Sequence, residues 1–224
     1  YRNVDVLARG VDTRLFNPQR RSTALRQSWN VAEDTLVFAY VGRLAPEKNL
    51  SLVTDAFDAI AEHHADARLL FVGDGPLASR LSRRHPRHIH AGLRRGEDLA
   101  GHYASADVFL FPSLTETYGN VVPEAMASGL AVLSYDCAAA ADLIDDGRNG
   151  RKVAAGDRQA FIEAALAMAG DRQRLKVFGG QAAATVAPLE WERIHERFAG
   201  KLQELLAVRT GGIADEKRLA LVPD

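Results

Sequence analysis

The 224-residue sequence has little cysteine, little net charge and no long apolar run, and each absence excludes a class of protein. The single cysteine, Cys137, cannot form an internal disulfide, so we expect a reducing compartment and exclude a disulfide-stabilised secreted domain. Lysine and arginine (28) balance aspartate and glutamate (29), so the net charge of −1 gives no overall field that would recruit nucleic acid or anionic lipid. No segment has the length of a membrane span, and no signal peptide is visible.

The sequence does contain enough apolar residues, 47% of the total, to build a substantial core. Short apolar segments alternate with segments that have the spacing of amphipathic helices. The predicted strands cover residues 4–12, 35–41, 68–72, 88–91, 107–111, 131–135 and 150–154. The predicted helices cover residues 22–29, 49–63, 77–84, 97–105, an Ala-rich stretch before the turn at 146–147, and then 157–170, 171–185 and 188–208. Residues 209–224 are expected to form a poorly ordered tail or a tether.

Fully apolar strands that alternate with helices predict a parallel sheet covered by helices on both faces. The predicted fold class is therefore α/β, a doubly wound, Rossmann-like domain whose ligand binds at the carboxyl ends of the strands. The loops that form this candidate site are 42–49, 73–76, 91–96, 112–122 and 136–141. Because the chain begins at Tyr1 and reads at once as a strand, we expect it to be a piece of a longer protein, with part of the active site elsewhere.

The most informative stretch is SLTETYGNVVPEAMASG, residues 113–129, which follows the apolar strand 107–111. A tight turn is expected at Gly119, and Pro123 fits the first turn of the helix that follows. The N-terminus of this helix should leave four backbone amides free, and such a site attracts phosphate. These are the amides of Gly119, Asn120, Val121 and Val122.

Two carboxylates, Glu116 and Glu124, bracket this turn with seven residues between them. Carboxylates beside an anion site repel the anion, so we interpret them as acceptors for sugar or ribose hydroxyls. One alternative is the acid and base pair of a glycoside hydrolase. Another is a helix-capping glutamate and a surface glutamate. The neighbouring phosphate-binding amides favour a nucleotide-sugar site over a bare saccharide cleft.

The segment VGRLAPEK, residues 41–48, comes directly off a strand end and carries two cations, Arg43 and Lys48. Two cations at a sheet edge where a helix begins are suited to hold a diphosphate. The alternative is a solvated loop with surface salt bridges.

The turn GDGPLA, residues 73–78, matches the dinucleotide fingerprint G-x-G-x-x-A, and Glu97 and Asp98 follow about twenty residues later. However, the turn lies after the second β–α unit, Pro76 stiffens it, and the acidic pair ends no obvious strand. We therefore favour a tight turn that borders a nucleotide. A non-catalytic nucleotide- or NAD-binding Rossmann-like module remains the alternative.

Three further features carry weaker signals. Six arginines could contact an anionic membrane surface, but their spread along a helix and a loop favours a solvated face. They are Arg80, Arg83, Arg84, Arg87, Arg94 and Arg95. Nearby histidines lack cysteine or carboxylate partners at metal spacing, so no metal site is predicted. They are His85, His88 and His90. Cys137 lacks an evident activating partner and is expected to be a buried, small apolar residue.

On these motifs, residues 1–206 closely resemble the C-terminal, donor-binding domain of a retaining glycosyltransferase of the GT-B fold, family four, the glycosyl transferases group one. Five fragments carry the resemblance in order. They are GVD…FNP (10–18), VGRLAPEKNL (41–50), FVGDGPL (71–77), YASADVFLFPS (103–113) and ETYGNVVPEAMASG (116–129), which holds the E-x7-E signature. Within the family the sequence looks most like bacterial mannosyltransferases and glycolipid-forming members, including sulfoquinovosyl and glycosyl diacylglycerol synthases.

The resemblance implies a hexosyltransferase that moves a sugar, with retention, from GDP-mannose or a UDP-hexose to an acceptor hydroxyl of a lipid or glycan. The implied catalytic residues are Arg43 and Lys48, which would hold the diphosphate, and Glu116, which would contact the transferred sugar. The implied donor-binding residues are Gly42, then Gly92 and Leu93 beside the base, the amides of Gly119, Asn120, Val121 and Val122, and Glu124 on the ribose. One departure stands out, because relatives often have a Gly-Gly turn and a Glu where this chain has AAAAD at 138–142.

The resemblance also sets expectations for the whole protein. It implies no cofactor and no metal, since the cations neutralise the phosphates. Residues 1–208 would be the donor-binding domain and 209–224 a tail, with the N-terminal acceptor domain of the same enzyme missing. Alone, the piece would bind donor weakly and catalyse little, because closure between two domains completes the site. A cytoplasmic location, peripheral membrane contact in the full-length protein and no nucleic-acid partner are expected.

Two enzymes of related architecture stay open as alternatives, a sugar-nucleotide epimerase and a phosphorylase. The phosphorylase would need a lysine that holds pyridoxal phosphate, and the sequence singles out none.

Overall fold

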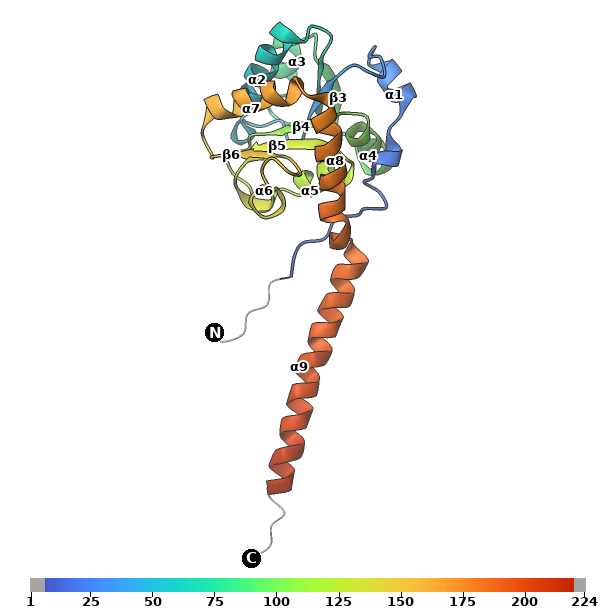
Figure 1. The fold of residues 1–224 in the computed structure, drawn as a ribbon, viewed down its shortest axis with the longest axis vertical. Helices are drawn as coiled ribbons and strands as arrows, with labels where there is room; N and C mark the ends of the chain where they lie inside the picture. The colour runs from blue at the N-terminus through green and yellow to red at the C-terminus, as the bar shows by residue number, and fades with distance from the viewer. Residues whose placement is uncertain (1–6, 220–224) are drawn as a thin grey trace, which may run out of the picture. The chain divides into compact units, whose positions relative to one another are not determined.

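The computed structural model describes residues 7–219, with side chains through residue 206, and divides the chain into two units (Figure 1). One unit is Val11–Ala187 and the other combines Tyr1–Gly10 with Pro188–Asp224. The first unit holds one six-stranded, fully parallel sheet in the order β3-β2-β1-β4-β5-β6. Its strands are β1 (Val37–Val41), β2 (Arg68–Val72), β3 (Ile89–Gly92), β4 (Val108–Phe111), β5 (Ala131–Tyr135) and β6 (Arg151–Val153). The predicted doubly wound, Rossmann-like α/β fold is thereby confirmed.

The helices alternate with these strands as the sequence predicts. In chain order they are η1 (Pro18–Arg20), α1 (Thr23–Ser28), η2 (Pro46–Lys48), α2 (Leu50–His63), α3 (Ala78–Arg84), α4 (Gly96–Ala104), α5 (Val121–Ala127), α6 (Ala138–Leu143), α7 (Arg158–Ala169), α8 (Arg172–Val186), η3 (Ala187–Leu189) and α9 (Trp191–Leu219). The central strands β1, β4 and β5 are buried along their whole length, which explains their continuous apolar sequences.

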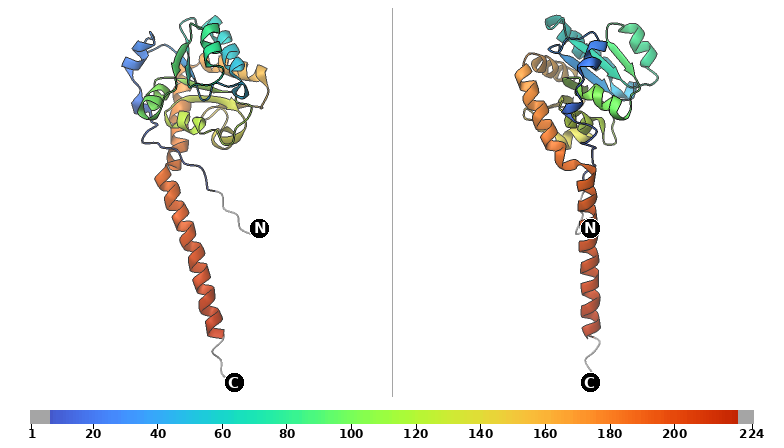
Figure 2. Two further views of the ribbon diagram at one scale, coloured as in Figure 1. Left: turned by 180° about the vertical axis from the view of Figure 1, so that it is seen from behind. Right: turned by 90° about the vertical axis from the view of Figure 1, so that its right-hand side faces the viewer.

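The helices form two layers around the sheet. Helix α2 packs with α7, whereas α5 packs with α4 and α8. Helices α2 and α3 lie on one face, and α5 and α6 lie across the strands from them (Figures 1 and 2), as expected for the right-handed connections of parallel strands. The winding reverses between the neighbouring strands β1 and β4, so the segments that follow them lead to opposite faces. Such a switch point is where doubly wound folds bind ligands.

Two expectations about the ends of the chain are wrong. Residues 7–10 of the expected strand 4–12 have no regular secondary structure, and residues 4–6 lie outside the described residues. A Cβ atom on Gly10 would lie 2.5 Å from the Trp191 ring, so this segment runs against α9 of its own unit. Helix α9 also continues to Leu219, past residue 208, where the predicted helix ends. Each of the two glycines at 211–212 costs only about 1 kcal/mol among strong helix formers.

Helix α9 exposes apolar side chains at helical spacing. Phe198, Leu202 and Leu205 are 49%, 44% and 67% exposed, and they recur four and three residues apart. This row is typical of a helix face that packs against another surface. Within the described part of the chain, no helix has the length and apolarity needed to cross a bilayer.

The glycines of the 73–78 turn serve backbone packing. A Cβ atom on Gly73 would lie 2.0 Å from the carbonyl oxygen of Gly42, and one on Gly75 would lie 2.5 Å from that of Leu44. Three backbone hydrogen bonds join the two loops: Gly42 N to Val72 O (3.0 Å), Leu44 N to Asp74 O (2.8 Å) and Leu77 N to Leu44 O (2.9 Å). This close contact accounts for the glycine pattern without a dinucleotide.

We therefore expect Gly73→Ala to lower the free energy of unfolding by about 3 kcal/mol or more, because φ at Gly73 is +138° and the added methyl meets backbone. Gly180→Ala is the matched control. It lies in α8 with nothing within 4 Å of the added Cβ, so it should be neutral or stabilising by up to about 1 kcal/mol. Chemical denaturation compares the two, and equal stabilities would contradict this role of Gly73.

Candidate functional site

An ion pair joins the two loops that leave the switch point. Lys48 Nζ lies 2.5 Å from Glu116 Oε1 and also donates to the Thr115 carbonyl oxygen at 3.3 Å. The two side chains are only 17% and 12% exposed. Lys48 is the last residue of the short turn η2, which begins at Pro46. Asn49, with a positive φ of 54°, caps this turn and precedes α2, so the backbone at Lys48 is held between two elements. The structure thus brings together a cation and a carboxylate whose roles the sequence predicts separately.

The other predicted cation, Arg43, has a different environment. Its side chain is 67% exposed and forms a loose pair with Glu47 at 3.7 Å, as a solvated loop would have. Its carbonyl oxygen accepts a hydrogen bond from the Tyr40 hydroxyl at 3.1 Å. Gly42 has φ of +149°, and a Cβ atom there would lie 3.0 Å from the same hydroxyl. The loop backbone is therefore fixed while the Arg43 guanidinium stays in solvent, and its contact with a diphosphate stays a prediction.

The start of α5 differs in one respect from expectation. The Val122 amide donates to the Gly119 carbonyl oxygen at 3.0 Å, so the prediction that it is free is wrong. A turn with positive φ at Gly119 (+83°) closes this hydrogen bond just before the helix. Within the described residues, no backbone acceptor is recorded for the amides of Gly119, Asn120 and Val121. Three of the four predicted amides, not all four, therefore lack a backbone acceptor among the described residues, and their contact with an anion stays a prediction.

Glu124 lies in the first turn of α5 and accepts a hydrogen bond from the Tyr103 hydroxyl at 3.0 Å. Burial raises the pKa of Glu124 to about 7, and the hydrogen bond from Tyr103 acts in the opposite direction. Burial also raises the pKa of Tyr103, so the phenol keeps its proton and donates. Tyr103 is not among the site residues that the sequence predicts. The sequence feature that could have identified Tyr103 is its aromatic ring on the apolar side of the helix that leads into β4.

The predicted base-binding residues lie at the carboxyl end of the edge strand β3. The Gly92 carbonyl oxygen accepts a hydrogen bond from the Gly73 amide at 2.8 Å, which ties β3 to the glycine turn. Leu93 follows and is 59% exposed, an unusual exposure for a leucine at a sheet edge. Arg94 pairs with Asp98 at 3.1 Å.

The segment after β5 contacts the central motif, but the predicted loop 136–141 is wrong in part, because residues 138–141 already belong to α6. The Ala139 amide donates to the Tyr118 carbonyl oxygen at 2.8 Å. Ala138 has a left-handed φ of 48°, which glycine adopts more easily than alanine. Ala138 is the first residue of the AAAAD segment, where the sequence departs from the Gly-Gly turn that the family resemblance implies. Cys137 is half-buried, so the prediction of a buried residue is wrong, because the start of α6 lies at the sheet edge. Burial still raises its thiol pKa.

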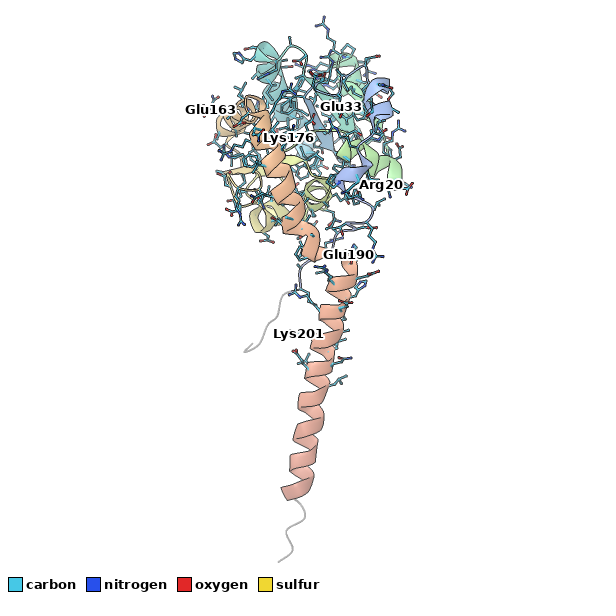
Figure 3. The ribbon with its side chains drawn as sticks, turned by 45° about the vertical axis from the view of Figure 1, so that its right-hand side comes forward. Arg20, Glu33, Glu163, Lys176, Glu190 and Lys201 are labelled. Atoms are coloured by element: carbon cyan, nitrogen blue, oxygen red, sulfur yellow. The ribbon has the colours of Figure 1, made fainter. Side chains whose placement is uncertain are left out.

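A separate cleft of about 620 Å³ lies at the other end of the sheet. It is lined by residues that precede β1, β4 and β5, such as Leu36, Asp107 and Gly129. Glu33 and Lys176, labelled in Figure 3, also line it. Its lining includes none of the predicted site residues. Because this cleft lies at the amino ends of the strands, it is not the ligand site that the fold predicts at their carboxyl ends.

Arg80 and Arg84 of the arginine cluster lie on α3 and are not among the predicted site residues. Arg80 and Arg84 line a cleft of about 450 Å³ together with Asp55 and Asp58 of α2. The His88 ring stacks on His85 with ring centres 5.1 Å apart, and burial lowers the pKa of His88 to about 4. Among the described residues, no three His, Cys, Asp or Glu side chains gather as metal ligands would.

Residues 35–171 match the family described as "Glycosyl transferases group 1". This match covers more than half of the chain and contains both loops of the ion pair. The chain belongs to the group 1 glycosyl transferases.

Members and structural neighbours of this family show how much of a complete enzyme the chain represents. It is 35% identical to a GDP-mannose-dependent alpha-mannosyltransferase of Mycobacterium tuberculosis, over 91% of this chain and 52% of the relative. Its fold matches Anabaena Alr3699/HepE in complex with UDP (TM-score 0.76, 23% identity), over 89% of this chain and 57% of that chain. It also matches the C-terminal domain of a group 1 protein (LpcC) from Francisella tularensis (TM-score 0.69, 20% identity), over 79% of this chain and 96% of that chain.

The chain spans only 33% to 52% of the length of the curated relatives compared first. Its architecture is that of the C-terminal half of a GT-B fold.

Proposed function

We propose that this chain is the donor-binding domain of a retaining hexosyltransferase, which binds a nucleoside diphosphate sugar, GDP-mannose or a UDP-hexose, for transfer to an acceptor hydroxyl. The observation that carries the proposal is the meeting of Lys48 and Glu116 at the switch point. A cation for phosphate and a carboxylate for sugar hydroxyls lie there side by side, at the edge where doubly wound folds bind ligands. The names of the mannosyltransferase relative and of the UDP complex support this ligand class.

The main chemical demand of such a transfer is the negative charge that develops on the departing diphosphate. In the free chain Glu116 neutralises Lys48. A bound donor would bring its diphosphate to Lys48 and its sugar hydroxyls to Glu116, so each partner exchanges one contact for another. Arg43, which is exposed, would move onto the phosphates. The amides of Gly119, Asn120 and Val121 would add fixed dipoles.

The remaining contacts would hold the nucleoside. Glu124 would accept hydrogen bonds from the ribose hydroxyls, and the exposed Leu93 would be covered by the base. No cofactor and no metal enter this scheme, since cations of the chain itself balance the phosphate charge.

The complete enzyme would add an N-terminal acceptor domain. The partial coverage of the relatives supports this, and so does the exposed apolar row of α9 at Phe198, Leu202 and Leu205. Residues 1–208 would then form the donor domain and residues 209–224 a tail, whose part up to Leu219 continues α9. Peripheral contact with the inner face of a membrane is part of the same proposal, because the sequence resembles glycolipid-forming members. A dinucleotide-binding module is disfavoured, since Gly73 and Gly75 are explained by backbone packing.

Calorimetric titration of the chain with GDP, UDP, GDP-mannose, UDP-glucose and NAD tests the proposal. We expect binding of one nucleoside diphosphate and of its sugar derivative. Binding of NAD alone would overturn it in favour of the glycine turn at 73–78.

A further inference from the structure

We propose that Tyr103 is a positioning residue that aims Glu124 at the ribose of the donor, and that Phe16 supports Tyr103 in turn. This inference rests on the proposed function, in which Glu124 binds the ribose hydroxyls. It assigns a role to the FNP fragment at 16–18, which the sequence comparison singles out and the donor site does not otherwise use.

The contact between Tyr103 and Glu124 leaves one carboxylate oxygen for a ligand. Tyr103 lies in the last turn of α4 and is completely buried, and its hydroxyl donates to Glu124 Oε2 at 3.0 Å. A buried hydroxyl needs its partner, because leaving it unpaired costs free energy. Glu124 itself is half-buried and so reaches the surface of the first turn of α5. With Oε2 held, Oε1 is the oxygen that faces an incoming hydroxyl.

Tyr103 cannot turn away from Glu124 because aromatic rings fix it. Its ring meets the edge of Phe16 at 5.7 Å between centroids, with an interplanar angle of 87°. It also meets Phe109 of β4 at 6.0 Å and 63°. Phe16 is 7% exposed, and the following Pro18 packs so closely on Gly129 that a Cβ there would lie 2.9 Å from it. The loop before η1 is therefore part of the packing under α4 and α5.

The hydrogen bond also favours the ionised form of Glu124, against the larger effect of burial. Burial raises the pKa of Glu124 to about 7, and the hydrogen bond from Tyr103 favours the ionised carboxylate. Among the described residues, Tyr103 is the titratable side chain that forms a hydrogen bond with Glu124. Without the Tyr103 hydroxyl, the Glu124 carboxyl would keep its proton to a higher pH, and its side chain would be free to rotate. Both changes weaken a hydrogen bond from a ribose hydroxyl and leave phosphate contacts intact.

Tyr103→Phe tests this role, since it removes the hydroxyl and keeps the ring. The probes are GDP and UDP and their 2′,3′-dideoxy counterparts, titrated between pH 6 and pH 9. The measured quantity is the ratio of the ribonucleotide affinity to the dideoxynucleotide affinity. Titration of the phosphates cancels in this ratio, because both probes carry the same phosphates. Tyr135→Phe is the control, because it removes a buried hydroxyl from β5 that does not contact Glu124. Unfolding midpoints establish that the variants fold.

We expect Tyr103→Phe to weaken the ribonucleotide about tenfold at pH 7 and to leave the dideoxy nucleotide unchanged. The pH midpoint of the affinity ratio should rise by about one unit. Phe16→Leu should shift the ratio in the same sense by a smaller factor, and Tyr135→Phe should not change it. If Tyr103→Phe does not fold, the affinity ratio of Phe16→Leu tests the positioning role of Tyr103 in its place.

Equal weakening of both nucleotides would mean a merely structural role and would overturn the inference. The inference would also be overturned if Tyr103→Phe left the ratio of ribonucleotide to dideoxynucleotide affinity unchanged. If the unsubstituted chain binds the two nucleotides equally well, or binds neither, then the proposed role of Glu124 fails and the inference falls with it. If the unsubstituted chain prefers the ribonucleotide and Tyr103→Phe keeps that preference, the proposed function stands and only the role of Tyr103 is lost.

Discussion

Lys48→Ala in the complete enzyme is expected to lower turnover by about 100- to 1,000-fold, the usual cost of removing one charge-stabilising group from a transition state. Lys48 is the cation whose position the structure fixes, through Glu116 and the Thr115 carbonyl oxygen. The substitution also leaves Glu116 without its partner, so the free energy of unfolding should fall by about 1–3 kcal/mol. Steady-state kinetics and denaturation separate the two effects.

The matched control is Lys176→Ala, an exposed lysine of α8 that lines the cleft at the amino ends of the strands (Figure 3). It should change neither turnover nor stability by more than about 0.5 kcal/mol. Lys48 would lose its proposed role if Lys48→Ala destabilised the fold while turnover stayed at the level of the control. Its role would then be the structural one of joining the loops after β1 and β4.

Glu124→Ala and Glu116→Ala are expected to separate the nucleoside from the sugar. Loss of a hydrogen bond to a charged group costs about 1.5–3 kcal/mol, so Glu124→Ala should weaken the free nucleoside diphosphate by about 10- to 100-fold. Glu116→Ala should weaken the nucleotide sugar and spare the free nucleotide. Affinity for the free nucleotide should even rise, because Glu116 no longer neutralises Lys48 and the diphosphate then meets an unpaired cation.

Calorimetric titration of both variants with nucleotide and nucleotide sugar decides between these roles. Equal losses for the two ligands in both variants would contradict the assignment. Glu116→Gln offers a further check, since it keeps the shape of the side chain, removes the charge and so should release Lys48 as the alanine does.

The sheet and the edge of it where the candidate loops meet were predictable from the sequence because both depend on local patterns. Fully apolar runs such as 37–41 and 131–135 identify buried parallel strands, and glycine with proline marks the loops at their carboxyl ends. Loops on the same sheet edge converge by topology alone. The site residues could therefore be named in sequence, although their roles remain proposals.

What could not be predicted depends on contacts between distant segments. Lys48 and Glu116 are 68 residues apart, and nothing in either loop indicates that they pair. Tyr103 reads as an ordinary core residue until its hydroxyl is placed beside Glu124. Arg26 is fully buried against the usual preference of arginine, because carbonyl oxygens such as those of Ala32 and Thr35 surround its guanidinium. Such bonds follow from the folded backbone and leave no periodic signal.

The most direct test of donor binding at the carboxyl ends of β1 and β4 is to follow backbone amide resonances of the chain during titration with GDP or UDP. We predict the largest shifts at Gly42, Leu93 and the segment 119–121, with the Gly73 amide affected less. Shifts confined to the amino ends of the strands, at residues such as Leu36 and Gly129, would contradict this account.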